Sequence, residues 1–167
     1  MAQKTSEILL ADADVLIDYV EADPDVLARC VRYFASVHVM QTTLEEVDGL
    51  TTSQCERLGI VVISVEPEIL TQAMDETLGL SIPDTICLLV ADQRQWTCVT
   101  NEKALRKRCE ERDVHVRRGL NLMIEFVREG HLVPKRAEKV ARAIQKSNPE
   151  HIHDGVIEEF LTAIGLE

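Results

Sequence analysis

The chain has 167 residues, of which 46% are hydrophobic and 28% charged, and its formal net charge is −11. This composition excludes a disordered chain, and the length suits one hydrophobic core rather than two large domains. The charge is uneven, because residues 1–92 carry 4 basic and 17 acidic side chains whereas residues 93–167 carry 14 and 12. An acidic protein is a poor general nucleic-acid binder, but the second half can supply a local basic face.

The five cysteines form no CxxC pair, so neither a disulfide framework nor a zinc knuckle is indicated. No signal peptide opens the sequence, and no apolar run approaches the ~20 residues that a membrane span needs. We therefore expect a reduced, soluble, cytoplasmic protein without membrane contact.

The first half alternates short apolar runs with helical patterns. The run Glu7–Ala11 predicts a strand, and Asp14 is a suitable N-cap for the helix that follows it. A helix begins at Asp23-Pro24, and the next strand is predicted at Val37–Met40. Two spacings typical of capping boxes follow, the first from Thr43 to Glu46 and the second from Ser53 to Glu56. A strand at Ile60–Val65 and a helix at Pro67–Leu78 complete this half.

The second half begins with Ser81, which is predicted to cap an almost wholly apolar helix with Asp84 in its first turn. A strand at Trp96–Val99, a helix from Asn101 and a weak strand at Asp113–Arg117 follow. Helical patterns fill the remainder of the chain. The alternation predicts an α/β fold with three α/β/α layers, a central, mainly parallel sheet of about five strands and a helical C-terminal tail. We expect residues 1–133 to form the domain and residues 134–167 a helical extension packed on or beside it.

Four acids fall at the carboxyl ends of predicted strands or at adjoining helix starts, which is where open parallel sheets gather functional groups. They are Asp12, Glu46, Asp84 and Glu102. Capping or a first-turn position explains each acid taken alone. Carboxylates converging on one edge would repel one another, by about 4 kcal/mol for a pair 4 Å apart near a surface. A hard cation removes that cost, so the recurrence predicts a Mg²⁺ or Mn²⁺ site.

Four segments together resemble the successive motifs of the PIN domain, a family of metal-dependent nucleases. They are ILLADADVLIDYV, TTLEEV, SIPDTICLLVA and CVTNEKALRKRCEERDVHV, which span roughly Ile8–Gly119. The resemblance implies a three-layer α/β/α fold, an acidic pocket that binds Mg²⁺ or Mn²⁺, and cleavage of phosphodiester bonds, usually in RNA. The chain is also similar to the VapC-like toxin group of this family, which implies a small antitoxin protein as a partner. A homodimer is a further expected assembly.

By this resemblance, the metal ligands are Asp12, Glu46, Asp84 and Glu102, with Thr100 orienting a carboxylate or the attacking water. Asp14 and Asn101 take supporting positions. The family most often has aspartate where this chain has Glu102, and the extra methylene puts direct metal contact there in question. The expected chemistry is attack of a metal-bound hydroxide on the scissile phosphate. The basic residues predicted to hold RNA are Arg106, Lys107, Arg108, Arg117 and Arg118.

Two other functions are compatible with the sequence. One is a catalytically weak or inactive PIN-like binding or regulatory protein, which the Glu102 departure and the acidic first half favour. The other is a haloacid-dehalogenase-type phosphatase, because Asp12 and Asp14 follow the first strand, although its lysine and later acidic motifs are not found. His151 and His153 lack a third ligand and are predicted to lie on the surface, as is Asp18.

Overall fold

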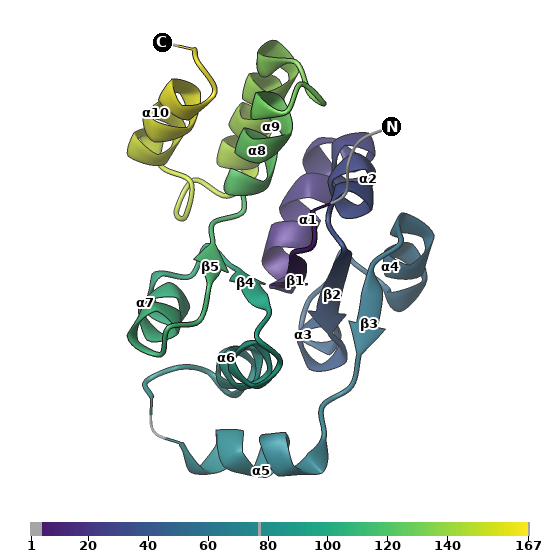
Figure 1. Cartoon of the computed structure of the whole chain (residues 1–167), viewed down its shortest axis with the longest axis vertical. Coiled ribbons are helices and arrows are strands. Elements are labelled where there is room, and N and C mark those ends of the chain that lie inside the picture. Colours follow the sequence, from purple (N-terminus) through teal and green to yellow (C-terminus); the bar gives the residue numbers. More distant parts are fainter. Residues whose placement is uncertain (1–4, 77, 167) are drawn as a thin grey trace.

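In the computed structural model, five parallel strands form one sheet with helices on both faces, which confirms the predicted three-layer α/β/α class (Figure 1). The structure describes residues 5–76 and 78–166. The strand order is β3-β2-β1-β4-β5. The strands are β1 (Ile8–Ala11), β2 (Ser36–Met40), β3 (Val61–Ile63), β4 (Thr97–Val99) and β5 (Val116–Arg117).

Strand β1 is central because it pairs with β2 on one side and with β4 on the other. The chain first builds outward from β1 to β3, then crosses the sheet and builds β4 and β5 on the opposite side. The order therefore reverses between β1 and β4, and ligand sites in open α/β sheets lie outside the carboxyl ends of the strands at such a reversal. Asp12 follows β1 directly, and Thr100 follows β4.

The side chains of β1 alternate between two apolar layers. Leu9 and Ala11 face the first of these layers, whereas Leu10 faces the second. Both layers are buried, which explains why the strands are nearly continuous runs of apolar residues. The helices of the first layer are α1 (Ala13–Ala22), α2 (Pro24–Tyr33), α4 (Thr52–Leu58), α8 (Asn121–Arg128), α9 (Pro134–Ser147) and α10 (Asp154–Ala163). Helix α3 (Gln41–Glu45) also contributes Leu44 to the first layer, and the helices of the second layer are α5 (Pro67–Asp75), α6 (Ile82–Arg94) and α7 (Lys103–Glu111).

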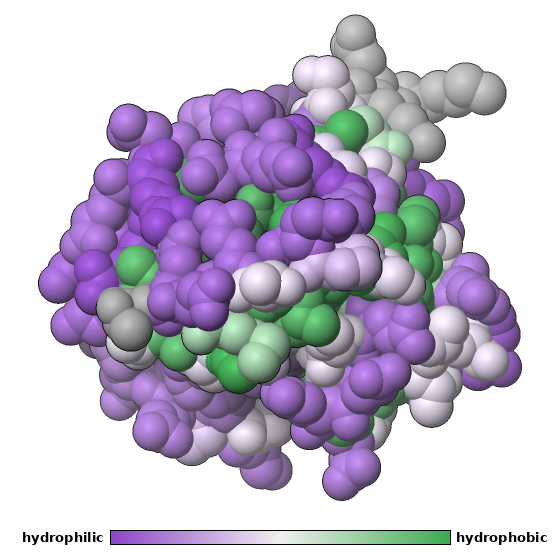
Figure 2. All heavy atoms as spheres, turned by 90° about the horizontal axis from the view of Figure 1, so that it is seen from below, coloured by the Kyte–Doolittle hydropathy of each residue, from purple (hydrophilic) through white to green (hydrophobic). Residues whose placement is uncertain are grey.

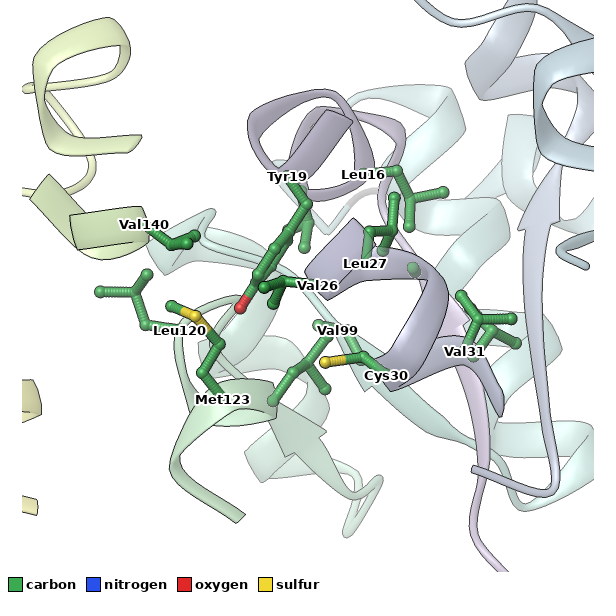
Figure 3. Packing of buried hydrophobic residues seen from close by; sticks show 14 of the residues in the cluster. Leu16, Tyr19, Val26, Leu27, Cys30, Val31, Val99, Leu120, Met123 and Val140 are labelled. Atoms are coloured by element: carbon green, nitrogen blue, oxygen red, sulfur yellow. The ribbon is translucent and has the colours of Figure 1, made fainter. Parts of the chain in front are cut away.

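The C-terminal helices α9 and α10 share the core of the first layer. Tyr19 of α1 is buried in the same cluster as Val140 of α9 and Met123 of α8, and its hydroxyl donates to the Gly119 carbonyl at 2.6 Å (Figure 3). Gly119 suits this position because a Cβ atom there would lie 3.1 Å from the side chain of Val15. Residues 134–167 were expected to pack on or beside the domain, and in the structure the described part of this segment contributes buried side chains to the largest apolar layer.

Several element boundaries differ from the predictions. Helix α5 ends at Asp75, whereas the predicted helix ended at Leu78. Thr77, which the prediction included, lies outside the described residues. Met74 of α5 is 66% exposed, so the α5 side of the molecule presents apolar side chains among mainly hydrophilic ones (Figure 2). Among the described residues, none of the helices is long and apolar enough to span a membrane.

Candidate acidic metal site

The first acid, Asp12, stands where β1 turns into α1. Its backbone N–H donates to the Val99 carbonyl of β4 at 2.9 Å, so the turn is tied to the neighbouring strand. Asp12 is the N-cap residue of α1 by backbone conformation, in place of the predicted cap Asp14, which lies exposed in the first turn. Within the described part of the chain, the Asp12 carboxylate makes no capping hydrogen bond to α1.

Thr100 connects the end of β4 to Asp12. The Thr100 hydroxyl is fully buried and donates to Oδ2 of Asp12 at 3.2 Å, while it accepts a hydrogen bond from the backbone N–H of Glu102 at 3.1 Å. Glu102 is the N-cap residue of α7, and in the described residues its side chain makes no capping bond. One buried hydroxyl thus holds the loops that carry the first and fourth acids.

The second acid, Glu46, does not open a helix. Helix α3 begins at Gln41, immediately after β2, and Glu46 is the residue at its carboxyl end. The predicted capping box is wrong because the Thr43 hydroxyl donates backward to the Met40 carbonyl at 2.8 Å instead of capping a new helix. A carboxylate at a helix carboxyl end opposes the helix dipole, so helix stability does not account for Glu46. Its side chain is exposed.

The third acid, Asp84, lies in the first turn of α6 as predicted. Ser81 caps this helix by accepting a hydrogen bond from the Asp84 backbone N–H at 3.2 Å. The backbone N–H of Asp84 is therefore satisfied by Ser81, and its carboxylate is left half-buried at the edge of the sheet. Helix dipole and capping preferences favour an acid here, so this position has a structural explanation as well as a functional one.

The four acids act on one another electrostatically. The pKa of Asp12 is raised from 3.8 to about 7, first by burial and then by the negative charges of Asp14 and Asp84, against the lowering effects of the Asp14 backbone and the Thr100 hydroxyl. Burial also raises the pKa of Asp84, as do the charges of Glu102, Asp14 and Glu46. Carboxylates from the ends of β1, β4 and α3 and from the start of α6 therefore meet at one edge of the sheet.

These acids form an open cluster rather than a finished cage. Among the described residues, no three histidine, cysteine, aspartate or glutamate side chains are gathered closely enough to enclose a metal ion. Part of the cluster opens into a cleft of about 270 Å³. We call it the acidic cleft, and it is lined by Asp12, Asp14, Ile17, Asp18, Glu21, Asn101, Glu102, Ser147, Asn148 and His151. Glu46 and Asp84 lie outside this lining.

The acidic cleft contains residues that the sequence did not single out. Asp18 was predicted to face solvent, but it is only 7% exposed, and burial raises its pKa from 3.8 to about 6. Asn148, at the end of α9, donates to Oδ2 of Asp18 at 3.2 Å. His151 was predicted to be a surface residue, but its Nε2 lies 3.1 Å from Oε1 of Glu102. The contact of His151 with Glu102 joins residues 49 positions apart, and that of Asn148 with Asp18 joins residues 130 positions apart. Such distant contacts leave no local signal in a sequence.

The predicted RNA-binding residues divide into two groups. Arg106 and Arg118 line a second cleft of about 330 Å³ together with Lys103, Glu102 and His151. We call this the basic cleft; it meets the acidic cleft at Asn101, Glu102 and His151. Burial and the positive charge of Arg118 lower the pKa of Arg106, so the two guanidinium groups repel each other there.

The other three basic residues lie elsewhere. Arg117 pairs with Glu7 and Glu125 and lines a cleft of about 600 Å³ at the amino ends of β1 and β4, the edge of the sheet opposite the acids. Arg108 pairs with Glu111 and donates to the Leu78 carbonyl. Lys107 is exposed on α7.

Asn101, predicted to support the site, makes two structural hydrogen bonds. Its Oδ1 accepts a hydrogen bond from the Gly119 backbone N–H at 3.0 Å, and its carbonyl accepts one from Arg106 at 2.7 Å. Asn101 therefore links the loop after β4 to the loop after β5 and holds Arg106 beside Glu102.

Comparisons with known proteins agree with this architecture. No family profile matches the chain, and no curated protein matches it in sequence. Among solved structures, it is similar to a PilT N-terminus (PIN) domain protein from the hyperthermophilic archaeon Sulfolobus solfataricus P2. The TM-score is 0.52 at 9% sequence identity, over 71% of this chain and 92% of the archaeal one. This likeness concerns the fold, and it supports the PIN-type architecture that the sequence motifs suggested.

Proposed function

We propose that this protein is a Mg²⁺- or Mn²⁺-dependent endoribonuclease that hydrolyses phosphodiester bonds. One observation carries the proposal: the Thr100 hydroxyl links the Asp12 carboxylate to the backbone of Glu102 at one edge of the sheet, where Asp14 and Asp84 lie close enough for their charges to raise the pKa of Asp12. Partly buried carboxylates that lie close together are costly in the free protein, and a divalent cation would remove that cost. The position of the cluster at the reversal of strand order and the PIN-type fold support the same function.

The donor set fits a hard divalent ion. Such ions take oxygen ligands, and a site with few carboxylates leaves positions for water and phosphate. When bound, the ion would supply a water of lowered pKa and positive charge for the phosphate oxygens. The residues that would hold it are Asp12, Glu46, Asp84 and Glu102.

The chain's own residues complete the site. Thr100 fixes the Asp12 carboxylate through its hydroxyl, and the exposed Asp14 adds negative charge that favours cation binding. Arg106 and Arg118 lie beside Glu102, where an anionic phosphate would relieve the repulsion between their guanidinium groups. An RNA strand could then contact the basic cleft while its scissile phosphate lies over the acids.

The test is cleavage of a fluorophore-labelled single-stranded RNA in Mn²⁺, with EDTA as the metal-free control. We expect Asp12→Asn to abolish cleavage. Glu46→Gln should reduce it strongly, whereas Glu45→Gln, which changes the neighbouring exposed acid, should leave it intact. Cleavage by Asp12→Asn at the wild-type rate would overturn the proposal. A DNA strand of the same sequence measures the preference for RNA.

The non-catalytic alternative rests on a specific contact, because Nε2 of His151 lies 3.1 Å from Oε1 of Glu102 and competes with a cation for that carboxylate. Calorimetric titration with Mn²⁺ separates the two functions. Saturable binding that Asp12→Asn abolishes supports the nuclease, whereas a wild-type protein that binds no Mn²⁺ supports a PIN-like binding or regulatory protein.

A role as the toxin of a toxin–antitoxin pair is a narrower form of the proposal. It predicts that expression of the wild-type chain, but not of Asp12→Asn, arrests growth. It also predicts a short adjacent or overlapping reading frame whose product relieves the arrest. Arrest by both proteins alike would contradict the toxin role.

A further inference from the structure

A chain of side-chain contacts joins the turn between α9 and α10 to both walls of the acidic cleft. Asn148 donates from Nδ2 to Oδ2 of Asp18 at 3.2 Å, and its Oδ1 lies 3.1 Å from Nδ1 of His151. The other ring nitrogen of His151 lies 3.1 Å from Oε1 of Glu102. Because the Asn148 amide group faces the Asp18 carboxylate, its oxygen is turned toward Nδ1 of His151. Both ring nitrogens of His151 therefore face acceptor oxygens, and the imidazolium form, which carries an N–H on each nitrogen, donates to Asn148 and Glu102 together.

The turn that carries these residues is fixed by the core. Ile144 in the last turns of α9 is 1% exposed and Ile152 beside His151 is 2% exposed, and both belong to the first apolar layer. The backbone N–H of Ile152 donates to the Asn148 carbonyl at 3.0 Å, which closes the turn. Buried anchors on both sides therefore set where the imidazole of His151 lies.

The length of Glu102 matches this contact. An aspartate at this position would end about one C–C bond, or about 1.5 Å, short of the glutamate carboxylate. The 3.1 Å separation from His151 would then exceed hydrogen-bonding range. The family pattern has aspartate at the position of Glu102. The longer glutamate side chain found here reaches His151 in the C-terminal part of the chain.

We propose that the α9–α10 turn completes the acidic cleft and that His151 is a positioning residue for Glu102. This inference rests on the proposed function, because it concerns how the cleft presents its fourth carboxylate to a divalent cation. Metal-ligating side chains are held by hydrogen bonds from a surrounding shell, and loss of such a partner typically lowers metal affinity or activity about 10- to 100-fold. Glu102, with three rotatable side-chain bonds, needs such an anchor more than the shorter Asp12 does, because the Thr100 hydroxyl already donates to the Asp12 carboxylate.

The experiment measures Mn²⁺ affinity of the full chain by calorimetry. We expect His151→Ala to weaken binding by about tenfold or more, and His151→Gln, whose amide can still donate to Glu102, to restore most of the affinity. The control is Lys146→Ala, which changes an exposed side chain in the last turn of α9 and should bind like wild type. Circular dichroism shows whether each variant keeps the wild-type fold.

Glu102→Asp gives the sharper comparison. It restores the commoner PIN residue, yet we expect it to weaken Mn²⁺ binding as much as His151→Ala does. Because both changes remove one contact, the double variant should be no weaker than either single variant. Equal affinity of wild type and His151→Ala, or fully additive losses in the double variant, would overturn the positioning role.

A metal-free readout separates this inference from the proposed function. Amide hydrogen exchange at residues 148–153 should be faster in Glu102→Asp than in wild type, because the turn loses its contact with α7. Unchanged exchange would show that the contact does not hold the turn and would overturn the inference. A wild-type chain that binds no Mn²⁺ overturns the proposed function. If the wild type binds Mn²⁺ and His151→Ala binds it equally tightly, the positioning role alone is overturned.

Discussion

The Thr100 hydroxyl lies 3.2 Å from Oδ2 of Asp12, and these two residues follow the adjacent parallel strands β4 and β1. Eighty-eight positions separate them in the sequence. Strand pairing brings them together, because Ala11 of β1 is in register with Val99 of β4 and both strands end at the same edge of the sheet. The hydroxyl is the fixed point from which the first and fourth acids of the cluster are oriented.

Thr100→Val keeps the shape of this buried side chain and removes both of its hydrogen bonds. We expect the free energy of unfolding to fall by about 1–3 kcal/mol, because the Asp12 carboxylate and the Glu102 N–H lose a partner. Thr85→Val is the matched control: Thr85 is also buried, but its hydroxyl donates only to the Ser81 carbonyl of its own helix. Urea denaturation compares the two, and equal losses would contradict a special role for Thr100.

Stability without metal should fall as pH rises, because Asp12 holds its proton longer in the folded protein than in the unfolded one. Its pKa is about 7 when folded and 3.8 in the reference state. Between these values the folded state binds more protons, so rising pH disfavours it, by up to about 4 kcal/mol for the full shift. Burial raises the pKa of Asp18 and Asp84 as well, and these groups add to the same slope.

Asp12→Asn removes the largest part of this dependence. In EDTA, we expect the variant to be more stable than wild type at pH 8 and about equally stable at pH 4, where Asp12 is mostly protonated in the wild-type fold. Denaturant melts at several pH values test this. A variant with the wild-type slope would show that Asp12 is not the group that titrates.

The sequence was sufficient to predict the layers, the place of Asp12 directly after a strand and the place of Asp84 in the first turn of a helix. Asp12 and Asp84 stand beside strong local signals: the end of an apolar strand, and a Ser-Pro helix start. Glu46 was found at the right edge for the wrong reason, since the spacing from Thr43 imitates a capping box that the chain does not form. The true box nearby runs from Thr51 to Gln54 rather than from Ser53 to Glu56.

The contacts made by the tail could not be predicted. His151 and Glu102 meet only because α9 packs on α1 and carries the following turn across the sheet edge. Helix periodicity shows that α9 has an apolar face, but it does not show which surface covers that face. The burial of Asp18 was missed for the same reason, because the residues that cover it lie in the tail.

Metal binding should release protons in a pH-dependent way, because a cation displaces the proton that Asp12 carries. At pH 6, about 0.9 proton per Mn²⁺ should come from a group with a pKa near 7, and about 0.1 at pH 8. Calorimetry in two buffers of different ionisation enthalpy measures this number. Release that does not change between pH 6 and pH 8 would contradict the participation of Asp12.

The C-terminal helices should unfold together with the sheet, because they share one apolar layer. Val140 of α9 is 2% exposed, and Val140→Ala should lower the free energy of unfolding by about 1–3 kcal/mol in a single transition. Val133→Ala changes the same residue type at a site that is 65% exposed, and it should shift stability by less than about 0.5 kcal/mol. A separate, earlier transition for Val140→Ala would mark the tail as an independent unit.

The two neighbouring arginines 117 and 118 should have opposite roles. Arg117 donates to both carboxylate oxygens of Glu7, at 2.8 and 2.6 Å, so Arg117→Ala should cost about 1–3 kcal/mol of stability. Arg118 lies in the basic cleft, and its ion pair with Glu159 spans 3.9 Å at an exposed site. Arg118→Ala should therefore change stability by less than about 0.5 kcal/mol.

For RNA binding, we expect Arg118→Ala to have the larger effect and Arg117→Ala the smaller one. In an Asp12→Asn background with EDTA, fluorescence anisotropy of a labelled single strand reports binding without cleavage. Loss of one phosphate contact in Arg118→Ala should lower affinity and reduce the slope of log K against log salt by about 0.7. Arg117→Ala, at the opposite edge of the sheet, should keep the wild-type slope, since its guanidinium is occupied by Glu7 and Glu125. If Arg117→Ala lowers the slope and Arg118→Ala does not, RNA binds at the amino ends of the strands, away from the acids.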